Sequence, residues 1–557
     1  MRLLPSVVIL PFLLSSAGFF SRIVEPGPVV HLSGGSLRGY FQGAAAVFKG
    51  IPYATPPVGN LRWREPQPPS PWLGVRDATK PGSACVQDPA GLSPFIQPLA
   101  AAYGASYGTE PVSSSEDCLY LNVWAPAWPV QGSLPVMVWL HGGSNSLGSG
   151  SQSTYDGISV AAHGVILVTI NYRLGVMGFF SHPELTAESP HHSSGNYGLL
   201  DQLAALKWVK ANIARFGGDP ENVTLFGESA GAIDAAMLMA SPLSAHLFAR
   251  VISESGPPFG VGPIQTRAQA ESLGERLGKA KPGNPSSPVA NLRKLSATDL
   301  TQLVNRRFNG PYPASLFVDG WVLREPPARA FASGAAQKAD LMVGLNGREL
   351  SAFRVVAASG AKISPQPPKN EGAVQMMERL AESVHPLYGG WTDAAITLYL
   401  FRALFDRTLA IDQATNDLLV ACPIGAQAAL TRIQGRKVFV YKFDRTIPGK
   451  GERTLGAFHG LEVPYVFSAL HDREWQWLPF TAADDRLASL IETYWTNFAK
   501  TGNPNSAGAP DWPAWENGSG SYMEFTQNGM PVSQPHFAPP FCDLSPEWLR
   551  KQLSNSN

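Results

Sequence analysis

The spacing of hydrophobic positions in this 557-residue chain changes after about residue 130. Between residues 30 and 130, short apolar runs alternate with Gly- and Pro-rich stretches, which predicts short antiparallel strands joined by loops. Longer, uninterrupted apolar runs follow, as is typical of strands buried on both faces of a parallel sheet. These runs span residues 136–140, 165–170, 223–226, 251–253, 341–344 and 438–443.

Helical periodicity separates several of these runs. Between residues 199 and 216 the apolar positions recur at helical spacing, and the glycines that follow at 217 and 218 end the helix. The roughly ninety residues between the last two runs are mostly of helical character, more than a crossover needs. We therefore expect an α/β fold with a large mixed, mostly parallel sheet flanked by helices. A helical insert around residues 350–430 is expected to cover the site.

The amino-acid composition and net charge limit the kinds of molecule that the protein is expected to bind. Hydrophobic residues make up 44% of the chain and charged residues 15%, and the formal net charge is zero. A neutral chain builds no strong positive field for nucleic acid or an anionic membrane, so we expect a small, neutral substrate and no nucleic-acid partner. Beyond the N-terminus no segment has the pattern of a transmembrane helix.

The N-terminus has the pattern of a secretory signal peptide. Arg2 precedes a short apolar run that ends in small residues at 15–18, and two prolines interrupt it. The run is too short to span a bilayer. We expect residues 1–18 to be removed on export, giving a secreted or periplasmic protein. Since no linker divides the rest, residues 19–557 are predicted to form one domain.

The chain contains four cysteines, Cys85, Cys118, Cys422 and Cys542. An even number in an exported protein predicts two disulfides, and spacing alone permits three pairings. No two cysteines form a Cys-x-x-Cys motif, and the adjacent histidines His191 and His192 lack the spacing of metal ligands. We therefore expect neither a metal nor an organic cofactor.

The sequence Gly227-Glu228-Ser229-Ala230-Gly231 lies between a predicted strand and a predicted helix. A strand, a sharp glycine-flanked turn and a helix form the nucleophile elbow, which exposes the serine Oγ above a sheet. Ser229 is therefore the predicted nucleophile, and the N–H group of Ala230 a predicted oxyanion donor. The His141-Gly142-Gly143-Ser144 loop after the 136–140 strand supplies further backbone donors. His141 itself is expected to be structural.

A serine nucleophile needs a base and an acid that orients it. In chain order the acid and then the histidine follow the serine, and the histidine lies in a loop after a late strand. Position and flanking glycines favour His459, with His471 second. The acid is expected after the 341–344 strand, where Glu349 is the only carboxylate, although Asp319 could compete. The remaining histidines after Ser229 are His246, His385 and His536.

Several stretches resemble the type-B carboxylesterase and cholinesterase family. They span residues 48–58, 116–124, 171–175, 195–202, 226–232 and 459–462. The resemblance implies an α/β-hydrolase fold and a triad of Ser229, His459 and Glu349. It implies oxyanion donation from Gly143 and Ser144, and support of the acid by Ser255. It also implies the disulfides Cys85–Cys118 and Cys422–Cys542.

Three departures from the family pattern bear on the substrate. Ser144 replaces the third glycine of the family's oxyanion loop, and residues 144–146 are polar where many relatives are apolar or aromatic. The 85–118 segment contains no Trp with which to hold a quaternary ammonium group. Ala352, three residues after the acid, replaces an aromatic residue. We therefore do not expect choline esters to be substrates, and we expect the substrate to be a polar or oxygenated ester.

The sequence thus predicts a serine carboxylic ester hydrolase that forms an acyl-enzyme on a neutral, polar or aromatic ester. One alternative is a catalytically inactive binding or adhesion protein, although the chain retains Ser229, Glu349 and His459. Another is an amidase or thioesterase that uses the same triad.

Overall fold

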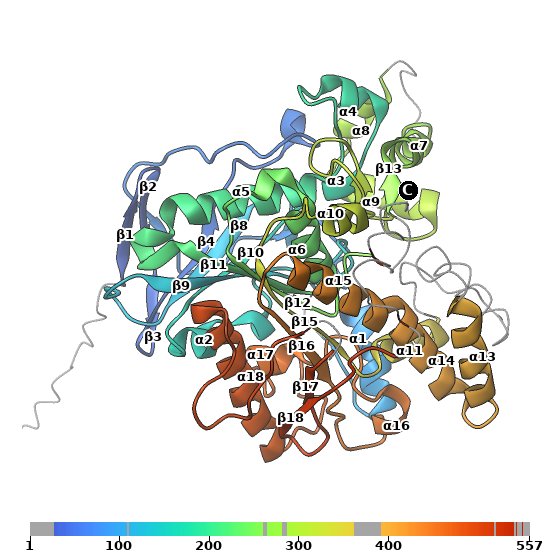
Figure 1. The fold of residues 1–557 in the computed structure, drawn as a ribbon. Helices are drawn as coiled ribbons and strands as arrows, with labels where there is room; N and C mark the ends of the chain where they lie inside the picture. The colour runs from blue at the N-terminus through green and yellow to red at the C-terminus, as the bar shows by residue number, and fades with distance from the viewer. Residues whose placement is uncertain are drawn as a thin grey trace, which may run out of the picture.

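A computed structural model of the chain describes residues 27–108, 111–259, 264–280, 287–360, 391–516 and 520–539, together with Cys542 and Leu549. The predicted signal peptide, His385 and residues 361–390 of the predicted insert lie outside this part. An 11-stranded sheet runs through the centre of the molecule (Figure 1).

The sheet is parallel in its centre and antiparallel at both edges. The buried parallel strands are therefore confirmed. The prediction of antiparallel strands between residues 30 and 130 holds for three pairs, whereas Gly35–Arg38 pairs parallel with Val75–Asp77, and Ala84–Cys85 with Ser114–Ser115. In spatial order the strands are β3 (Tyr40–Gln42), β4 (Ala45–Pro52), β8 (Tyr120–Ala125), β10 (Ile166–Ile170), β9 (Leu134–Leu140), β11 (Gly218–Glu228), β12 (Arg250–Glu254), β15 (Asp340–Asn346), β16 (Val438–Phe443), β17 (Tyr522–Phe525) and β18 (Pro531–Gln534). A separate small sheet contains β1 (Val29–Leu32), β2 (Gly35–Arg38) and β5 (Val75–Asp77).

Alternate residues of β9 contribute to two hydrophobic cores, one on each face of the sheet. Val136 and Val138 belong to the core that contains residues of α5 (Tyr197–Asn212) and α6 (Ala230–Ala240). Met137 and Trp139 belong to the core that contains residues of α18 (Ala482–Thr501). Successive side chains of a strand point to opposite faces, so a continuous apolar run stabilises both helical layers. Figure 1 shows α5 and α6 on one side of the sheet and α18, with α17 (Val463–Val466), on the other.

The described part of residues 350–430 is helical. It contains α11 (Glu349–Ala358), α13 (Trp391–Ala403), α14 (Arg407–Asn416) and α15 (Cys422–Ile433), with a π-helical turn at Asp417–Ala421 before α15. The first of these helices begins at the residue predicted to be the triad acid. The helix predicted at residues 199–216 is α5 followed by a 3₁₀ turn at Ile213–Phe216, and Gly217 ends it at a φ of 84°.

Two disulfides connect Cys85 to Cys118 and Cys422 to Cys542, the pairs implied by the family resemblance. The first closes a segment that contains α1 (Ser93–Ala102). The second joins the start of α15 to the C-terminal region. Both pairs are buried.

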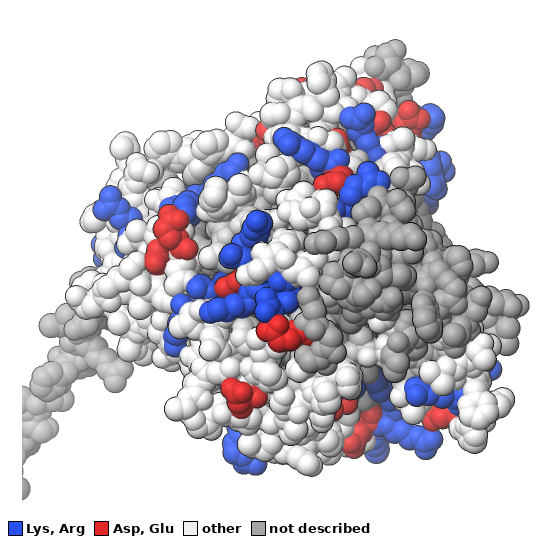
Figure 2. Space-filling view, viewed as in Figure 1, with Lys and Arg blue, Asp and Glu red and all other residues white. Residues whose placement is uncertain are grey.

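The charged side chains on the face drawn in Figure 2 lie in small groups of both signs among uncharged residues. This distribution agrees with a formal net charge of zero. A search of the described helices finds none with the length and hydropathy needed to cross a bilayer.

Candidate active site

Ser229 lies at the sharp turn between β11 and α6, as the motif predicts. Its backbone has φ 56° and ψ −123°, a conformation that a non-glycine residue adopts only when its surroundings impose it. Glycine is required at position 231, because a Cβ there would lie 2.0 Å from the carbonyl oxygen of Leu140. The tight packing of β9 against the start of α6 thus fixes the turn that carries Ser229.

Three of the predicted residues form one chain of hydrogen bonds. His459, in the loop between α16 (Glu452–Leu455) and α17, places Nε2 2.8 Å from Ser229 Oγ. Its Nδ1 lies 2.6 Å from Glu349 Oε2. Glu349 is only 1% exposed, and its Oε1 accepts a hydrogen bond from Asn346 N at 2.6 Å. This geometry suits a histidine that transfers a proton to and from Ser229 while a buried carboxylate holds its ring.

The competing candidates have other partners. The exposed side chain of His471 bonds to Asp485 at 2.7 Å. Asp319 is buried and accepts hydrogen bonds from Ser193 Oγ and from the backbone N–H of Leu323. Asp319 therefore has a structural role and is not the acid that orients His459.

A second carboxylate contacts the histidine, and the sequence analysis did not assign it a role. Glu228 Oε1 lies 3.2 Å from His459 Nε2. Burial alone would lower the pKa of His459, but the negative charges of Glu228 and Glu349, and the hydrogen bond that His459 donates to Glu349, raise it to about 9. Burial raises the pKa of Glu228 to about 7. Its position directly before the nucleophile in the Gly-Glu-Ser-Ala-Gly motif could have indicated from the sequence that Glu228 lies near the base.

Ser255, which the resemblance implies as a support of the acid, forms its hydrogen bond with a different carboxylate. Its Oγ donates to Glu462 Oε1 at 3.0 Å. Asn346 joins the two carboxylates, because its backbone N–H donates to Glu349 and its Nδ2 donates to Glu462. Ser255 is therefore connected to the acid only indirectly, through Glu462 and Asn346.

The residues after β9 form a tight turn against the nucleophile; we call residues 142–147 the donor loop. The carbonyl oxygen of Gly143 accepts from Ser146 N and Leu147 N, each at 3.0 Å. A Cβ at Gly142 would lie 2.6 Å from Glu228 Oε2 and 3.2 Å from the Cβ of Ser229, so the loop requires glycine there. Ser144 has a φ of 55°, so the serine that replaces the family's third glycine adopts a left-handed backbone conformation.

His141 has a structural environment, as expected. It is 1% exposed, and its Nδ1 bonds to the carbonyl of Gly142 at 2.8 Å. Its ring stacks on Tyr172 at a centroid distance of 4.5 Å. Burial lowers the pKa of His141 to about 4, so the ring is neutral near pH 7.

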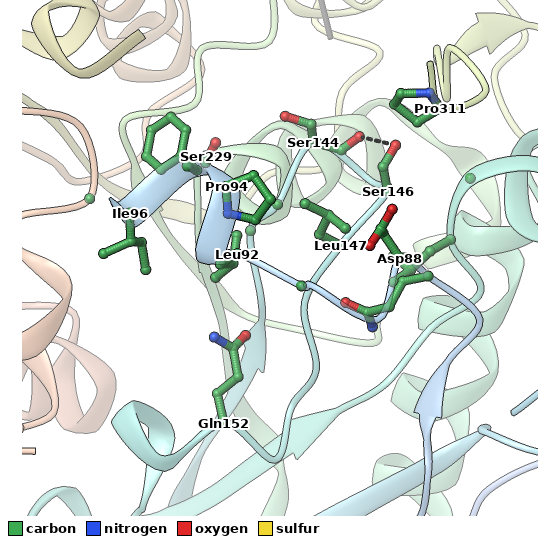
Figure 3. A pocket seen from close by; sticks show the side chains of 18 of the residues that line it. Asp88, Leu92, Pro94, Ile96, Ser144, Ser146, Leu147, Gln152, Ser229 and Pro311 are labelled. Carbon is green, nitrogen blue, oxygen red and sulfur yellow. Dashed lines mark hydrogen bonds between the residues drawn. The ribbon is translucent and has the colours of Figure 1, made fainter. Parts of the chain in front are cut away.

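A cavity of about 290 Å³ opens above Ser229 and His459 and is lined mainly by apolar and aromatic side chains. Its walls come from α1, α9 (Ala297–Phe308) and residues 474–477, and the last two were not predicted to contribute. Figure 3 shows Ser144, Ser146 and Ser229 around this cavity with Leu92, Pro94 and Ile96. Its aromatic lining residues are Phe95, Tyr155, Tyr312, Phe353, Phe458, Trp475 and Trp477.

Two of the residues at which the chain departs from the family pattern, Ala352 and Asn145, do not line the cavity. Ala352 is fully buried in the core, and the neighbouring Phe353 lines the cavity instead, 5.1 Å from the ring of His459. Asn145 is absent from the lining, since its side chain bonds to Asp234 inside the protein. Of the three polar residues at positions 144–146 of the donor loop, only Ser144 and Ser146 line the cavity. Among the described residues, no cluster of three His, Cys, Asp or Glu side chains could hold a metal ion.

Comparisons with known proteins identify the family. A model of the carboxylesterase family matches residues 26–540. A fumonisin B1 esterase of Sphingopyxis macrogoltabida is 36% identical over 512 residues, which cover 90% of this chain and 87% of that protein. The para-nitrobenzyl esterase of Bacillus subtilis strain 168 is 37% identical over 490 residues, which cover 86% and 91% of the two chains.

Solved structures give the same result. A carboxylesterase of Geobacillus stearothermophilus superposes with a TM-score of 0.76 at 32% identity, covering 93% of this chain and 99% of that one. A PNB esterase superposes with a TM-score of 0.75 at 33% identity, covering 94% and 99%. These matches confirm the α/β-hydrolase fold. The chain belongs to the carboxylesterase family and is a carboxylic ester hydrolase.

Proposed function

We propose that this enzyme hydrolyses its ester through an acyl-enzyme on Ser229, with His459 and Glu349 completing the triad. The observation that carries the proposal is the unbroken hydrogen-bond chain from Ser229 Oγ through His459 to Glu349. Ser229 Oγ attacks the ester carbonyl carbon while His459 Nε2 takes its proton. The buried carboxylate of Glu349 stabilises the imidazolium that forms.

The tetrahedral intermediate then collapses. Its C–O bond to the alcohol breaks, and His459 gives the proton to the departing oxygen. His459 then takes a proton from a water molecule, whose oxygen attacks the acyl carbon. The bond from that carbon to Ser229 Oγ breaks, and His459 returns the proton to Oγ, which releases the acid and restores Ser229. In both steps the negative oxygen lies among the backbone N–H groups of Gly143, Ser144 and Ala230, where fixed donors stabilise charge that develops only in the transition state.

The proposed substrate is a neutral ester with a polar or aromatic group. The many aromatic rings around the cavity suit a ring, and the hydroxyls of Ser144 and Ser146 suit an oxygenated substituent. Two of the relatives are named for para-nitrobenzyl and fumonisin B1 esters, which makes both compounds reasonable members of a test panel. The same triad could also cleave amides or thioesters, so the panel includes one of each.

We further propose that the chain is exported. The support is the pattern of residues 1–18, together with four cysteines that are all paired in the structure.

The Ser229→Ala variant tests the nucleophile. We expect kcat for ester hydrolysis to fall by about 10⁵-fold, because no other group forms the acyl-enzyme. A serine-directed phosphonate should label the wild-type protein and not this variant. The matched control is Ser146→Ala, a serine that lines the same cavity and should leave labelling intact. Labelling that survives Ser229→Ala would disprove the mechanism.

The Glu228→Gln variant tests the electrostatics around the base. Removing this negative charge should lower the pKa of His459, because the charge stabilises the imidazolium. His459 acts as a base only when neutral, so the acidic limb of kcat/KM against pH should shift to lower pH. Glu474→Gln is the control, since Glu474 lines the cavity but bonds to Thr154 Oγ1 at 2.6 Å. A limb that stays in place or moves to higher pH would contradict this account.

Kinetics on matched esters test the substrate class. Esters with hydroxylated or aromatic groups should give higher kcat/KM than simple alkyl esters. In Ser144→Gly, which keeps the left-handed backbone and removes the hydroxyl, the preference for hydroxylated esters should fall about fivefold, the value of one hydrogen bond of about 1 kcal/mol. A uniform preference for alkyl chains would refute the proposal.

Export is tested by expressing the chain with its own N-terminus in a secreting bacterial host. We expect active protein outside the cytoplasm, with an N-terminus near residue 19 by mass spectrometry. A chain lacking residues 2–18 should stay in the cytoplasm. Recovery of the unprocessed full chain from the cytoplasm alone would rule the proposal out.

A further inference from the structure

Asn145 connects the donor loop to the interior of the protein. Its Nδ2 donates to Asp234 Oδ1 at 3.0 Å, and its carbonyl oxygen accepts from Gly175 N at 2.7 Å. The residue is only 4% exposed, so its side chain contributes nothing to the surface or to the cavity. The polar side chain of Asn145 is therefore bonded inside the protein and does not reach the space that a substrate would occupy.

Asp234 accepts a second buried amide. Gln202 Nε2, on α5, donates to Asp234 Oδ2 at 2.5 Å, and both residues are fully buried. Burial raises the pKa of Asp234 to about 7, and the hydrogen bonds from Asn145 and Gln202 oppose this rise. Within the part of the chain that the structure describes, no Lys, Arg or His side chain pairs with this carboxyl group, and a buried carboxyl group without such a partner is costly.

The position of Asp234 suggests a role for this carboxyl group. It lies on α6, the helix that begins with Ala230 directly after Ser229. The proposed oxyanion donors come from two segments, the donor loop and the start of α6. Asp234 and Asn145 join these same two segments by a hydrogen bond between side chains.

The loop needs such a restraint. Ser144 and Asn145 are successive non-glycine residues with φ values of 55° and 53°. Non-glycine residues in this region cost energy and persist only where surrounding contacts hold them. The bond to Asp234 is a buried contact that can hold them.

We propose that Asp234 is a positioning residue that acts through Asn145 to hold the donor loop against α6, and so fixes the spacing of the oxyanion donors. The proposal rests on the proposed acyl-enzyme mechanism and assigns a function to residues that contact neither the ester nor the triad. Without Asp234, two buried amides lose their acceptor and the loop can shift away from the nucleophile. Stabilisation that exists only in the transition state is then lost, while substrate binding is not.

Two single variants test the link from its two ends. Asp234→Ala removes the acceptor, and Asn145→Gly removes the donor while keeping a residue that tolerates positive φ. For each we expect kcat to fall by about 10- to 100-fold with little change in KM, as for a displaced catalytic group. Affinity for a trifluoromethyl ketone, which forms a tetrahedral oxyanion adduct on serine, should fall in parallel. The double variant should be no more impaired than Asp234→Ala, because Asp234→Ala already removes the hydrogen bond that Asn145→Gly removes.

An exchange of the two groups tests for rescue. Asn145→Asp alone places two carboxyl groups face to face and should be strongly impaired. Adding Asp234→Asn restores a donor opposite an acceptor and should return kcat to within about threefold of the wild type. This double variant retains the volume of both side chains, so it decides the question even if Asp234→Ala fails to fold.

The control for a purely structural effect is Asp484→Asn. Asp484 is also fully buried and bonds to Arg445 and Tyr465, none of which lines the cavity. This variant should lower the thermal midpoint and leave kcat of the folded enzyme unchanged.

Either of two results would overturn the proposal: folded Asp234→Ala or Asn145→Gly enzyme with wild-type kcat, or an exchange variant no better than Asn145→Asp. These results are distinguishable from failure of the acyl-enzyme mechanism. In that case wild-type protein would not be labelled at Ser229 by the phosphonate.

Discussion

The hydrogen bond between His459 and Glu349 is the interaction on which the rest of the site depends. It joins residues 110 positions apart in the sequence and closes the chain that reaches Ser229. Its geometry is set by the sheet, because Ser229 follows β11 and Glu349 follows β15, both at the carboxyl ends of parallel strands. Neighbouring loops at that edge bring the three side chains together, and the sheet's two buried faces hold the edge in place.

Much of this could be predicted from sequence because it depends on local signals. A continuous apolar run predicts a strand buried on both faces, and a glycine-flanked serine after such a run predicts the elbow. Chain order and flanking residues then favoured His459 over His471, whereas the choice of Glu349 over Asp319 also needed the family resemblance. The strand and elbow predictions use only a residue and its immediate neighbours, and the order of the triad residues along the chain adds the rest.

The errors and omissions have a different origin. Ser255 bonds to Glu462, and Asn145 bonds to Asp234, and neither partner is near in sequence. The cavity walls from α9 and from residues 474–477 were missed for the same reason, since amphipathic segments carry no signal of what they face. Side-chain partners across long sequence separations follow from tertiary packing, which one sequence without relatives does not reveal.

The cavity is built from two kinds of segment. Ser229, Glu349 and the donor loop follow the ends of sheet strands, and His459 lies in the loop between α16 and α17. Much of the wall belongs instead to α1, α9 and residues 474–477, which contain no member of the triad. α1 lies within the loop closed by Cys85 and Cys118, and so is tethered independently of the sheet. Substitutions in these walls can therefore reshape what the enzyme admits while the reacting groups stay in place. Such a separation of selectivity from reactivity gives directed evolution a defined set of positions at which to change substrate range.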